Sequence, residues 1–198
     1  MSNPWRTRTG IHVPLMSLVA SSVALLCAAC GATTVRPLVP SAHLPIYEGH
    51  SAELFDDGIG AQALGSRIEP ILSPPERELL RERTNLCDSV VRARVVSLTS
   101  AQGESGPRWF IGLHTVERLT GERHAPDNFM VLIDGNAPGA RLLRALDGQI
   151  IGAPLVAFLR EFASTDGKEG QRHFHLAGDG KDEVDAVRVA ALVGDVGP

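Results

Sequence analysis

The chain has 198 residues, a net charge of −4 at pH 7 and only three cysteines. This length is enough for one domain with a buried core. An acidic chain without a basic run argues against a nucleic-acid partner.

The first 30 residues have the composition of an export signal. Arg6 and Arg8 are their only charges, and an apolar stretch follows that ends in Ala28-Ala29-Cys30. A positive start, a short apolar run and small residues before a cleavage point are typical of such a signal. Because a cysteine comes directly after the two small residues, the stretch resembles the lipobox of bacterial lipoproteins.

The lipobox resemblance implies that residues 1–29 are a signal peptide and that the sulfur of Cys30 carries diacylglycerol. The lipid bilayer of the bacterial envelope would then hold the protein, and Gly31 in place of Asp favours the outer membrane. Cys27 stands where a lipobox usually has Leu, so plain secretion and a retained anchor stay open as alternatives. The apolar run of about 15 residues is short for a membrane span, which needs about 20. Once Cys27 is removed and Cys30 acylated, Cys87 is left without a disulfide partner and is expected to be buried.

Residues 30–60 are interrupted by proline and glycine and show little apolar periodicity. This composition predicts the lipidated Cys30 followed by a flexible tether, and a single globular domain over residues 61–198. The paired carboxylates Asp56 and Asp57 are expected to be solvated in this tether. Its end could contact the domain through three residues, Tyr47, Leu54 and Phe55.

The rest of the chain predicts an α+β domain. Ser73-Pro74-Pro75-Glu76 forms a capping box that begins a helix, and apolar residues alternate with polar ones in the stretches that predict strands. The expected elements are a helix at 74–87, strands at 89–99, 109–119 and 128–134, a helix at 140–147, strands at 154–162 and 172–177, and a helix at 182–193. This order predicts a five-stranded antiparallel sheet or small OB-like barrel with flanking helices.

Three segments support the barrel prediction: Asp88-Ser-Val-Val-Arg-Ala-Arg-Val, Val116-Glu-Arg-Leu-Thr-Gly-Glu and Gly152-Ala-Pro-Leu-Val-Ala-Phe-Leu. Their pattern resembles that of exported bacterial OB-like modules, which are similar in shape to the netrin and metalloproteinase-inhibitor barrels. The resemblance covers roughly residues 74–178. The N-terminal cysteine and the disulfides by which the inhibitors act are missing from this sequence, so the resemblance does not imply inhibition.

One candidate ligand site lies on the predicted hairpin. Arg92 and Arg94 are two residues apart and therefore share a strand face, and Trp109 lies on the neighbouring strand. OB-like barrels use such a face to bind oligomeric ligands, and an exported protein meets envelope proteins and glycans. The alternative is that the arginines pair with Glu117 across the hairpin and bind no ligand.

A candidate metal site is formed by His173 and His175, which are two apart on a predicted strand and can reach one ion. His114 or His124 is the candidate third ligand. The alternative is an exposed polar strand face.

No cofactor is expected, because the chain lacks a Gly-x-Ser-x-Gly nucleophile motif and a phosphate-binding Gly-rich loop. The sequence therefore favours a lipid-anchored, non-enzymatic binding or assembly module. A metal-dependent enzyme that uses the His-x-His pair is the alternative.

Overall fold

The computed structural model describes residues 43–60, 63, 72–103, 106–121, 125–146, 149–164 and 169–194. All of them lie in the compact unit that spans Leu38–Pro198. Cys30, the predicted signal peptide and His124 fall outside the described residues. Within the described residues, no helix is both long enough and apolar enough to cross a membrane.

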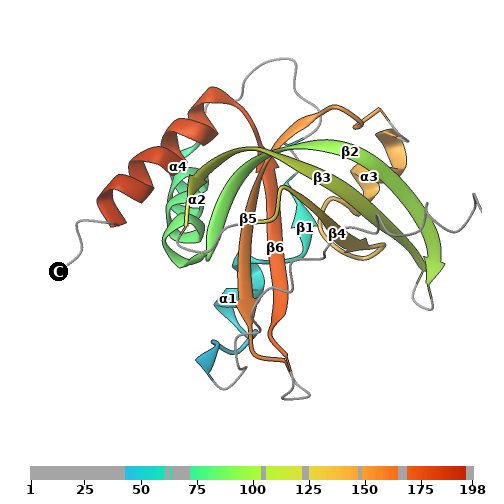
Figure 1. Ribbon diagram of the computed structural model, residues 1–198, viewed down its shortest axis with the longest axis horizontal. Coiled ribbons are helices and arrows are strands. Elements are labelled where there is room, and N and C mark those ends of the chain that lie inside the picture. Colours follow the sequence, from blue (N-terminus) through green and yellow to red (C-terminus); the bar gives the residue numbers. More distant parts are fainter. Residues whose placement is uncertain are drawn as a thin grey trace, which may run out of the picture. The chain divides into compact units, whose positions relative to one another are not determined.

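The described part of the chain forms one six-stranded mixed sheet and four helices (Figure 1). The strand order is β1-β6-β5-β2-β3-β4, in which only the β1–β6 pair is parallel. In chain order the elements are α1 (His50–Leu54), β1 (Gly58–Ile59), α2 (Pro74–Leu86), β2 (Ser89–Gly103), β3 (Gly106–Thr120), β4 (Asn128–Asp134), α3 (Ala140–Leu146), β5 (Pro154–Phe162), β6 (Gln171–Gly178) and α4 (Lys181–Gly194).

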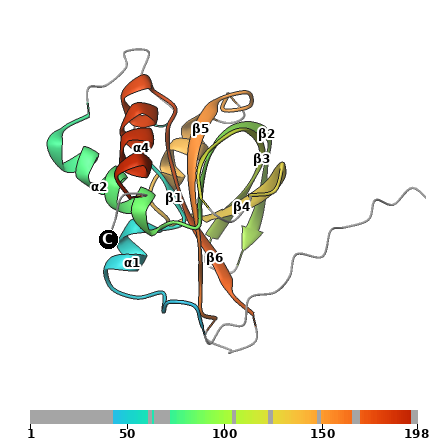
Figure 2. The same ribbon diagram turned by 60° about the vertical axis from the view of Figure 1, so that its left-hand side comes forward.

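The sheet curls strongly without closing, as the turned view in Figure 2 shows for β2, β3 and β4. Register shifts between β2 and β3, the last at Val95/Ser97, accompany the bend. Bulges of this kind increase the local twist and bend a strand. The curl leaves β4 and β1 as the two ends of the sheet.

Each face of the sheet buries its own apolar cluster, and β5 contributes to both. Leu155, Ala157 and Leu159 belong to the cluster inside the curl, which α3 covers with Ala140 and Leu143. The second cluster packs under α1, α2 and α4 and includes Leu54, Phe55, Leu80, Val156, Phe158, Phe162, Val184 and Val187. A strand that is buried on both faces needs a continuous apolar run, which explains the sequence of β5.

The predicted capping box is present at the start of α2. The backbone amide of Ser73 donates to the Glu76 carboxylate at 2.9 Å, and its hydroxyl donates to the same oxygen at 2.6 Å. Two prolines follow Ser73 in the first turn of the helix. Proline fits there because the amides of the first turn have no hydrogen-bond acceptor within the helix. These local contacts set the start of the helix independently of the rest of the fold.

The α+β class and each predicted helix and strand are confirmed, but the predicted sheet was incomplete. A sixth strand, β1, runs parallel to β6, so the sheet is mixed and not wholly antiparallel. The hairpin of β2 and β3 also extends to Gly103 and Gly106, beyond the predicted strand ends.

Residues 43–60, assigned to the tether by composition, belong to the folded unit. Leu54, Phe55 and Ile59 are fully buried. The backbone amides of Asp57 and Gly60 donate to the carbonyls of Phe174 and Leu176 on β6, at 3.0 and 2.8 Å. Their elements are so short that the apolar residues show no period, which is why composition predicted a tether.

Candidate functional site

A groove of about 720 Å³ lies between β4 and the first half of β6. One wall is β4 from Phe129 to Leu132 together with Asp134, and the other is formed by residues 171–174, Asp56 and Asp57. We call this space the β4–β6 groove. Its volume lies within the range of about 300–1,000 Å³ that is typical of ligand sites.

One end of the β4–β6 groove is closed by the loop that follows β4. The amide of Ile59 donates to the carbonyl of Pro138 at 3.0 Å, so this loop is fastened to β1. Gly139 has a φ of +76°, and a Cβ there would lie 2.1 Å from the Ile59 carbonyl oxygen. The contact therefore depends on glycine, and it joins β1 to the loop that follows β4.

The β4 wall offers unpaired backbone groups to the groove. The amide of Thr115 donates to the carbonyl of Asp127 at 2.8 Å, one residue beyond the His114–Asn128 pair of β3 and β4. Bonded and non-bonded pairs alternate along an antiparallel ladder. The N–H and C=O groups of Met130 and Leu132 therefore point away from β3, and no described strand pairs with β4 on that side.

The opposite wall holds a closely packed group around His173. The Nδ1–H of His173 donates to Asp57 Oδ2 at 2.7 Å, and the amide of Phe174 donates to Asp57 Oδ1 at 3.1 Å. Tyr47 stacks on the imidazole with its ring centroid 3.4 Å away, and its hydroxyl donates to the carbonyl of Phe55 at 2.6 Å. Burial and the neighbouring Asp57 carboxylate raise the pKa of Tyr47 to about 12, so its hydroxyl remains protonated at neutral pH.

His175 repeats this arrangement one step along β6. Its Nδ1–H donates to Asp56 Oδ1 at 2.8 Å, and the same carboxylate oxygen also accepts the amide of Gly58 at 3.1 Å. Burial lowers the pKa of His175, against the opposing effect of its bond to Asp56. The imidazole borders a second hollow of about 200 Å³ beneath α2, which Arg83 also lines.

The structure brings together His173 and His175 but not His114. His173 and His175 are 8% and 7% exposed, so the expectation of an exposed polar face is incorrect for them. His114 is exposed on β3, three strands from β6, and contacts Asn128 at 2.9 Å. Among the described residues no group of three or more His, Cys, Asp or Glu side chains could hold a metal ion.

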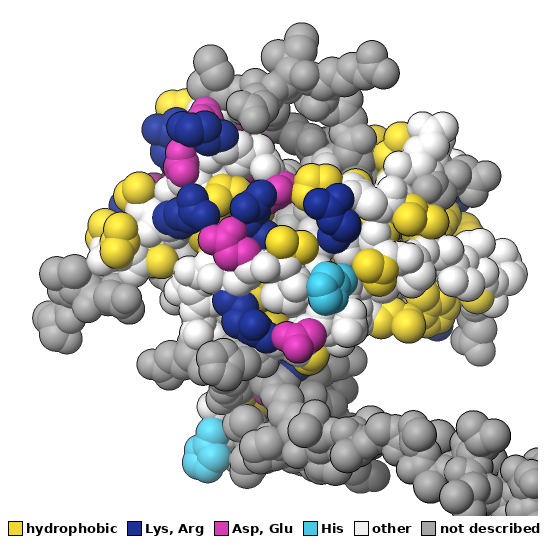
Figure 3. Space-filling model, turned by 45° about the horizontal axis from the view of Figure 1, so that its top comes forward, with side chains coloured by type: hydrophobic (Ala, Val, Ile, Leu, Met, Phe, Trp, Pro, Cys, Tyr) yellow, Lys and Arg dark blue, Asp and Glu magenta, His cyan; other side chains and the backbone are white. Residues whose placement is uncertain are grey.

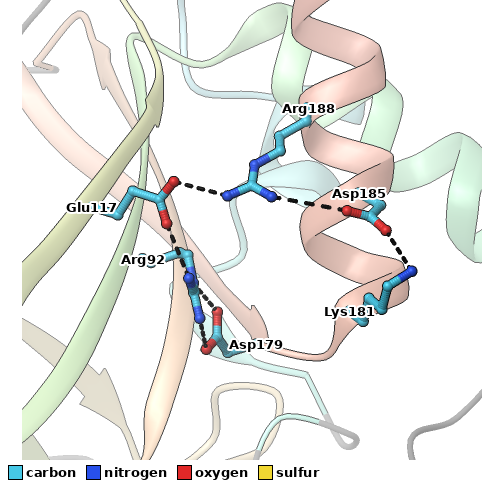
Figure 4. Close-up of polar contacts among 6 residues, drawn as sticks. All are labelled: Arg92, Glu117, Asp179, Lys181, Asp185 and Arg188. Carbon is cyan, nitrogen blue, oxygen red and sulfur yellow. Dashed lines mark hydrogen bonds and ion pairs between the residues drawn. The ribbon is translucent and has the colours of Figure 1, made fainter.

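Arg92 belongs to a chain of charges that joins the sheet to α4 (Figure 4). Its guanidinium donates to both oxygens of Asp179, at 2.6 and 2.7 Å, and to Glu117 at 2.9 Å. Glu117 also accepts from Arg188 of α4 at 2.8 Å. These bonds raise the pKa of Arg92 and lower the pKa of Glu117. The expected pairing with Glu117 is confirmed for Arg92, whose donors are therefore engaged within the protein.

The other two candidate ligand residues also make internal contacts. Arg94 donates to the carbonyl of Gly152 at 2.7 Å. Trp109 is 6% exposed within the core, and the Arg144 guanidinium lies 5.8 Å from the centre of its ring. The three predicted ligand residues thus do not form one open surface.

Exposed apolar side chains gather on the convex face of β2, β3 and β4 (Figure 3). Val96 is 51% exposed on β2, and Met130 and Leu132 are 65% and 36% exposed on β4. In the same view, side chains of both charges lie close together toward α4 (Figure 3). The hydrophobic face therefore borders the unpaired edge of β4.

Cys87 is half-buried at the end of α2, where its thiol donates to the carbonyl of Thr84 at 3.2 Å. Burial raises its pKa to about 12, so the thiol is not an activated nucleophile.

Sequence reasoning found the His-x-His pair but missed the partners of both imidazoles. Asp56 and Asp57 precede His173 by more than a hundred residues, and their stretch read as a tether. The only signal was the match between two adjacent carboxylates and two histidines on one strand face. The β4–β6 groove had no signal, since it depends on how far the sheet curls.

Comparison with protein-family models, with curated proteins and with solved structures finds no match to this chain. The sequence and the geometry of the described residues therefore have to carry any functional proposal.

Proposed function

We propose that this chain is a lipid-anchored protein of the bacterial envelope, that its folded unit is a non-enzymatic binding module, and that the β4–β6 groove is its ligand site. The observation that carries the proposal is this groove, bounded on one side by unpaired backbone groups and exposed apolar side chains. The curled, open sheet supports the resemblance to OB-like modules, with β1 as an addition to the five expected strands.

The arrangement of the two histidines supports a binding module over an enzyme. Each imidazole uses Nδ1 to hold a carboxylate from the segment before β1. The Nε2 atom of His173 is shielded from solvent and has no hydrogen-bond partner among the described residues. A general base must reach its substrate within about 3 Å, and a shielded nitrogen does not. The pairs fasten the chain in place, which is a structural role.

The anchor is proposed from the lipobox at Cys30, by which the acyl chains would hold the protein in the outer membrane. The acidic balance of the chain supports attachment by the lipid alone, without a further electrostatic contact with anionic headgroups. Envelope proteins and glycans are the ligands within reach of such an anchor.

The experiment is the intact mass of the protein from membrane and soluble fractions, for the wild type and for Cys30→Ser. We expect a membrane-bound species that begins at Cys30 and carries diacylglycerol and an acyl chain, and a soluble Cys30→Ser protein. Cys27→Ser is the matched control and stays in the membrane. An unmodified wild-type protein in the soluble fraction would overturn the proposal of a lipid anchor.

A further inference from the structure

We infer that the β4–β6 groove binds an extended polypeptide segment of a partner protein, which adds a strand to the free edge of β4. The inference rests on the proposed function only in taking this groove as the ligand site, and it does not depend on the lipid anchor. It names the class of ligand as a peptide strand whose side chains are apolar at alternate positions and which carries a basic residue.

The backbone groups along the β4 edge favour a peptide strand as the ligand. The outward N–H and C=O groups of Met130 and Leu132 are spaced for a neighbouring strand, which would satisfy both kinds of group at once. A glycan or a small molecule satisfies them only in part, since its donors and acceptors do not repeat at the spacing of a peptide backbone.

Within the part of the chain that the structure describes, the β4 strand itself lacks the usual protection against strand addition. Natural edge strands carry lysine, proline or a bulge, or they are very short. β4 has seven residues, has none of these between Asn128 and Ile133, and pairs with β3 without a register shift. Its one charge, Asp134 at the end, is engaged by Arg108 at 2.7 Å.

The β4–β6 groove also lies directly beside this edge. The groove volume of about 720 Å³ lies where the next strand of a curled sheet would run. The bond from Ile59 to Pro138 closes one end of the groove, which limits the length of the added strand. The far wall is formed by residues 171–174 with Asp56 and Asp57, so the space bounded by the two walls suits one added segment better than the sheet of a second copy.

The charge of the groove walls determines which charge the bound segment should carry. The groove is lined by three aspartates, Asp56, Asp57 and Asp134, against one arginine, Arg172. Arg172 is itself paired with Glu161 at 3.4 Å. Asp134 is likewise paired with Arg108, so the negative charge of the lining comes from Asp56 and Asp57, and it complements a basic segment. Met130 and Leu132 add an apolar flank on the convex side, which fits alternate apolar side chains of the added strand.

The test is a selection of random decapeptides displayed on phage against the full-length protein in detergent. We expect binders that alternate apolar residues and carry lysine or arginine. Each binder is synthesised in two further copies, with N-methyl groups on its odd or on its even amides. One of the two copies should bind at least about tenfold more weakly, because only every second amide faces β4 and donates to it. Binders that tolerate methylation of both sets, or a selection that yields none, would overturn the inference.

Variants locate the site. Leu132→Pro removes an N–H that points away from β3, so the fold is kept while binding is lost. Met130→Lys places a charge on the same edge and gives a second variant if the proline disturbs folding. Val96→Lys is the matched control, since Val96 is also exposed, at 51% against 65% for Met130, but lies on β2, away from the edge. Equal affinity of all three variants for the peptides would contradict a site at β4.

Hydrogen exchange distinguishes binding of a peptide at β4 from pairing with a second copy of the chain. Bound peptide should slow exchange at the amides of Met130 and Leu132 and leave the β2–β3 amides unchanged. Slowing that rises with protein concentration in the absence of peptide would identify a dimer and overturn the inference. The anchor is measured separately: a lipidated membrane protein without peptide binders overturns only this inference, whereas a soluble, unmodified protein with binders overturns only the anchor.

Discussion

Asp57→Ala tests whether the segment before β1 is held by its carboxylates. Asp57 accepts from His173 Nδ1 at 2.7 Å and from the amide of Phe174 at 3.1 Å. Each buried donor that loses its acceptor destabilises a protein by about 1–3 kcal/mol. The Asp57 side chain is 33% exposed, so in Asp57→Ala water can hydrogen-bond in part to the two donors. We therefore assign each donor a loss at the low end of the range, about 1 kcal/mol.

The backbone adds a further contribution, because Asp57 has a φ of +49°. Aspartate tolerates this left-handed conformation better than alanine, for which it costs about 1 kcal/mol. The free energy of unfolding of Asp57→Ala should therefore fall by about 3 kcal/mol in total. For a domain of this size that loss corresponds to a melting temperature lower by about 6–12 °C. Asp57→Asn keeps the backbone preference and one acceptor, and should lose about 1 kcal/mol.

The assay is urea unfolding followed by circular dichroism, with hydrogen exchange of residues 43–60 as a second reading. Asn128→Ala is the control, since it removes an exposed contact with His114 and should change stability by less than about 0.5 kcal/mol. If Asp57→Ala remained within about 1 kcal/mol of the wild type, the two bonds would not be what holds the segment, and our reasoning about this wall of the groove would fail.

Three further predictions concern the framework around the groove. Arg92→Ala leaves the Asp179 carboxylate, which is only 6% exposed, without its bidentate partner. The free energy of unfolding measured in urea should therefore fall by about 2 kcal/mol. A change near zero would mean that the charge network is dispensable. Burial lowers the pKa of His175, so as the pH falls this imidazole is protonated in the unfolded chain before it is protonated in the folded protein. The free energy of unfolding should therefore fall as the pH drops from 7.5 through about 6.5. His175→Gln should weaken this dependence of the urea midpoint on pH, and an unchanged dependence would contradict the prediction. Gly139→Ala should lower the melting temperature far more than Gly152→Ala, because both have positive φ but only the first would place a Cβ against backbone; equal losses would refute the close approach to β1.

Elements with their own local signal could be predicted from the sequence. The capping box at Ser73 sets the start of α2, and the continuous apolar run of β5 follows from burial on both faces. β1 has no such signal: it consists of Gly58 and Ile59 alone, and it is a strand only because β6 lies beside it. A two-residue strand is defined by its tertiary partner, which no local pattern encodes.

Of the candidate site, too, only the residues with a local pattern could be predicted from the sequence. Two histidines two residues apart predict a shared strand face, which β6 provides. Their partners, Asp56 and Asp57, come from a distant part of the chain, so the local pattern offered only a shared metal ion or an exposed polar face as explanations. Arg92 likewise predicted a cross-strand pair with Glu117, but its stronger bidentate partner, Asp179, lies 87 residues further along the chain.

The pairing of β1 with β6 also determines the order in which this protein can be assembled. Asp56 and His175 are 119 residues apart, so the contact closes almost the whole described chain into one loop. Contacts of such long sequence separation form late, because the entropy of loop closure must be overcome first. During synthesis residues 43–60 emerge before the rest of the described residues, yet their docking site is completed only when β6 has followed. Until then Leu54 and Phe55 remain without their core, and the last step of folding brings the beginning of the domain to its end.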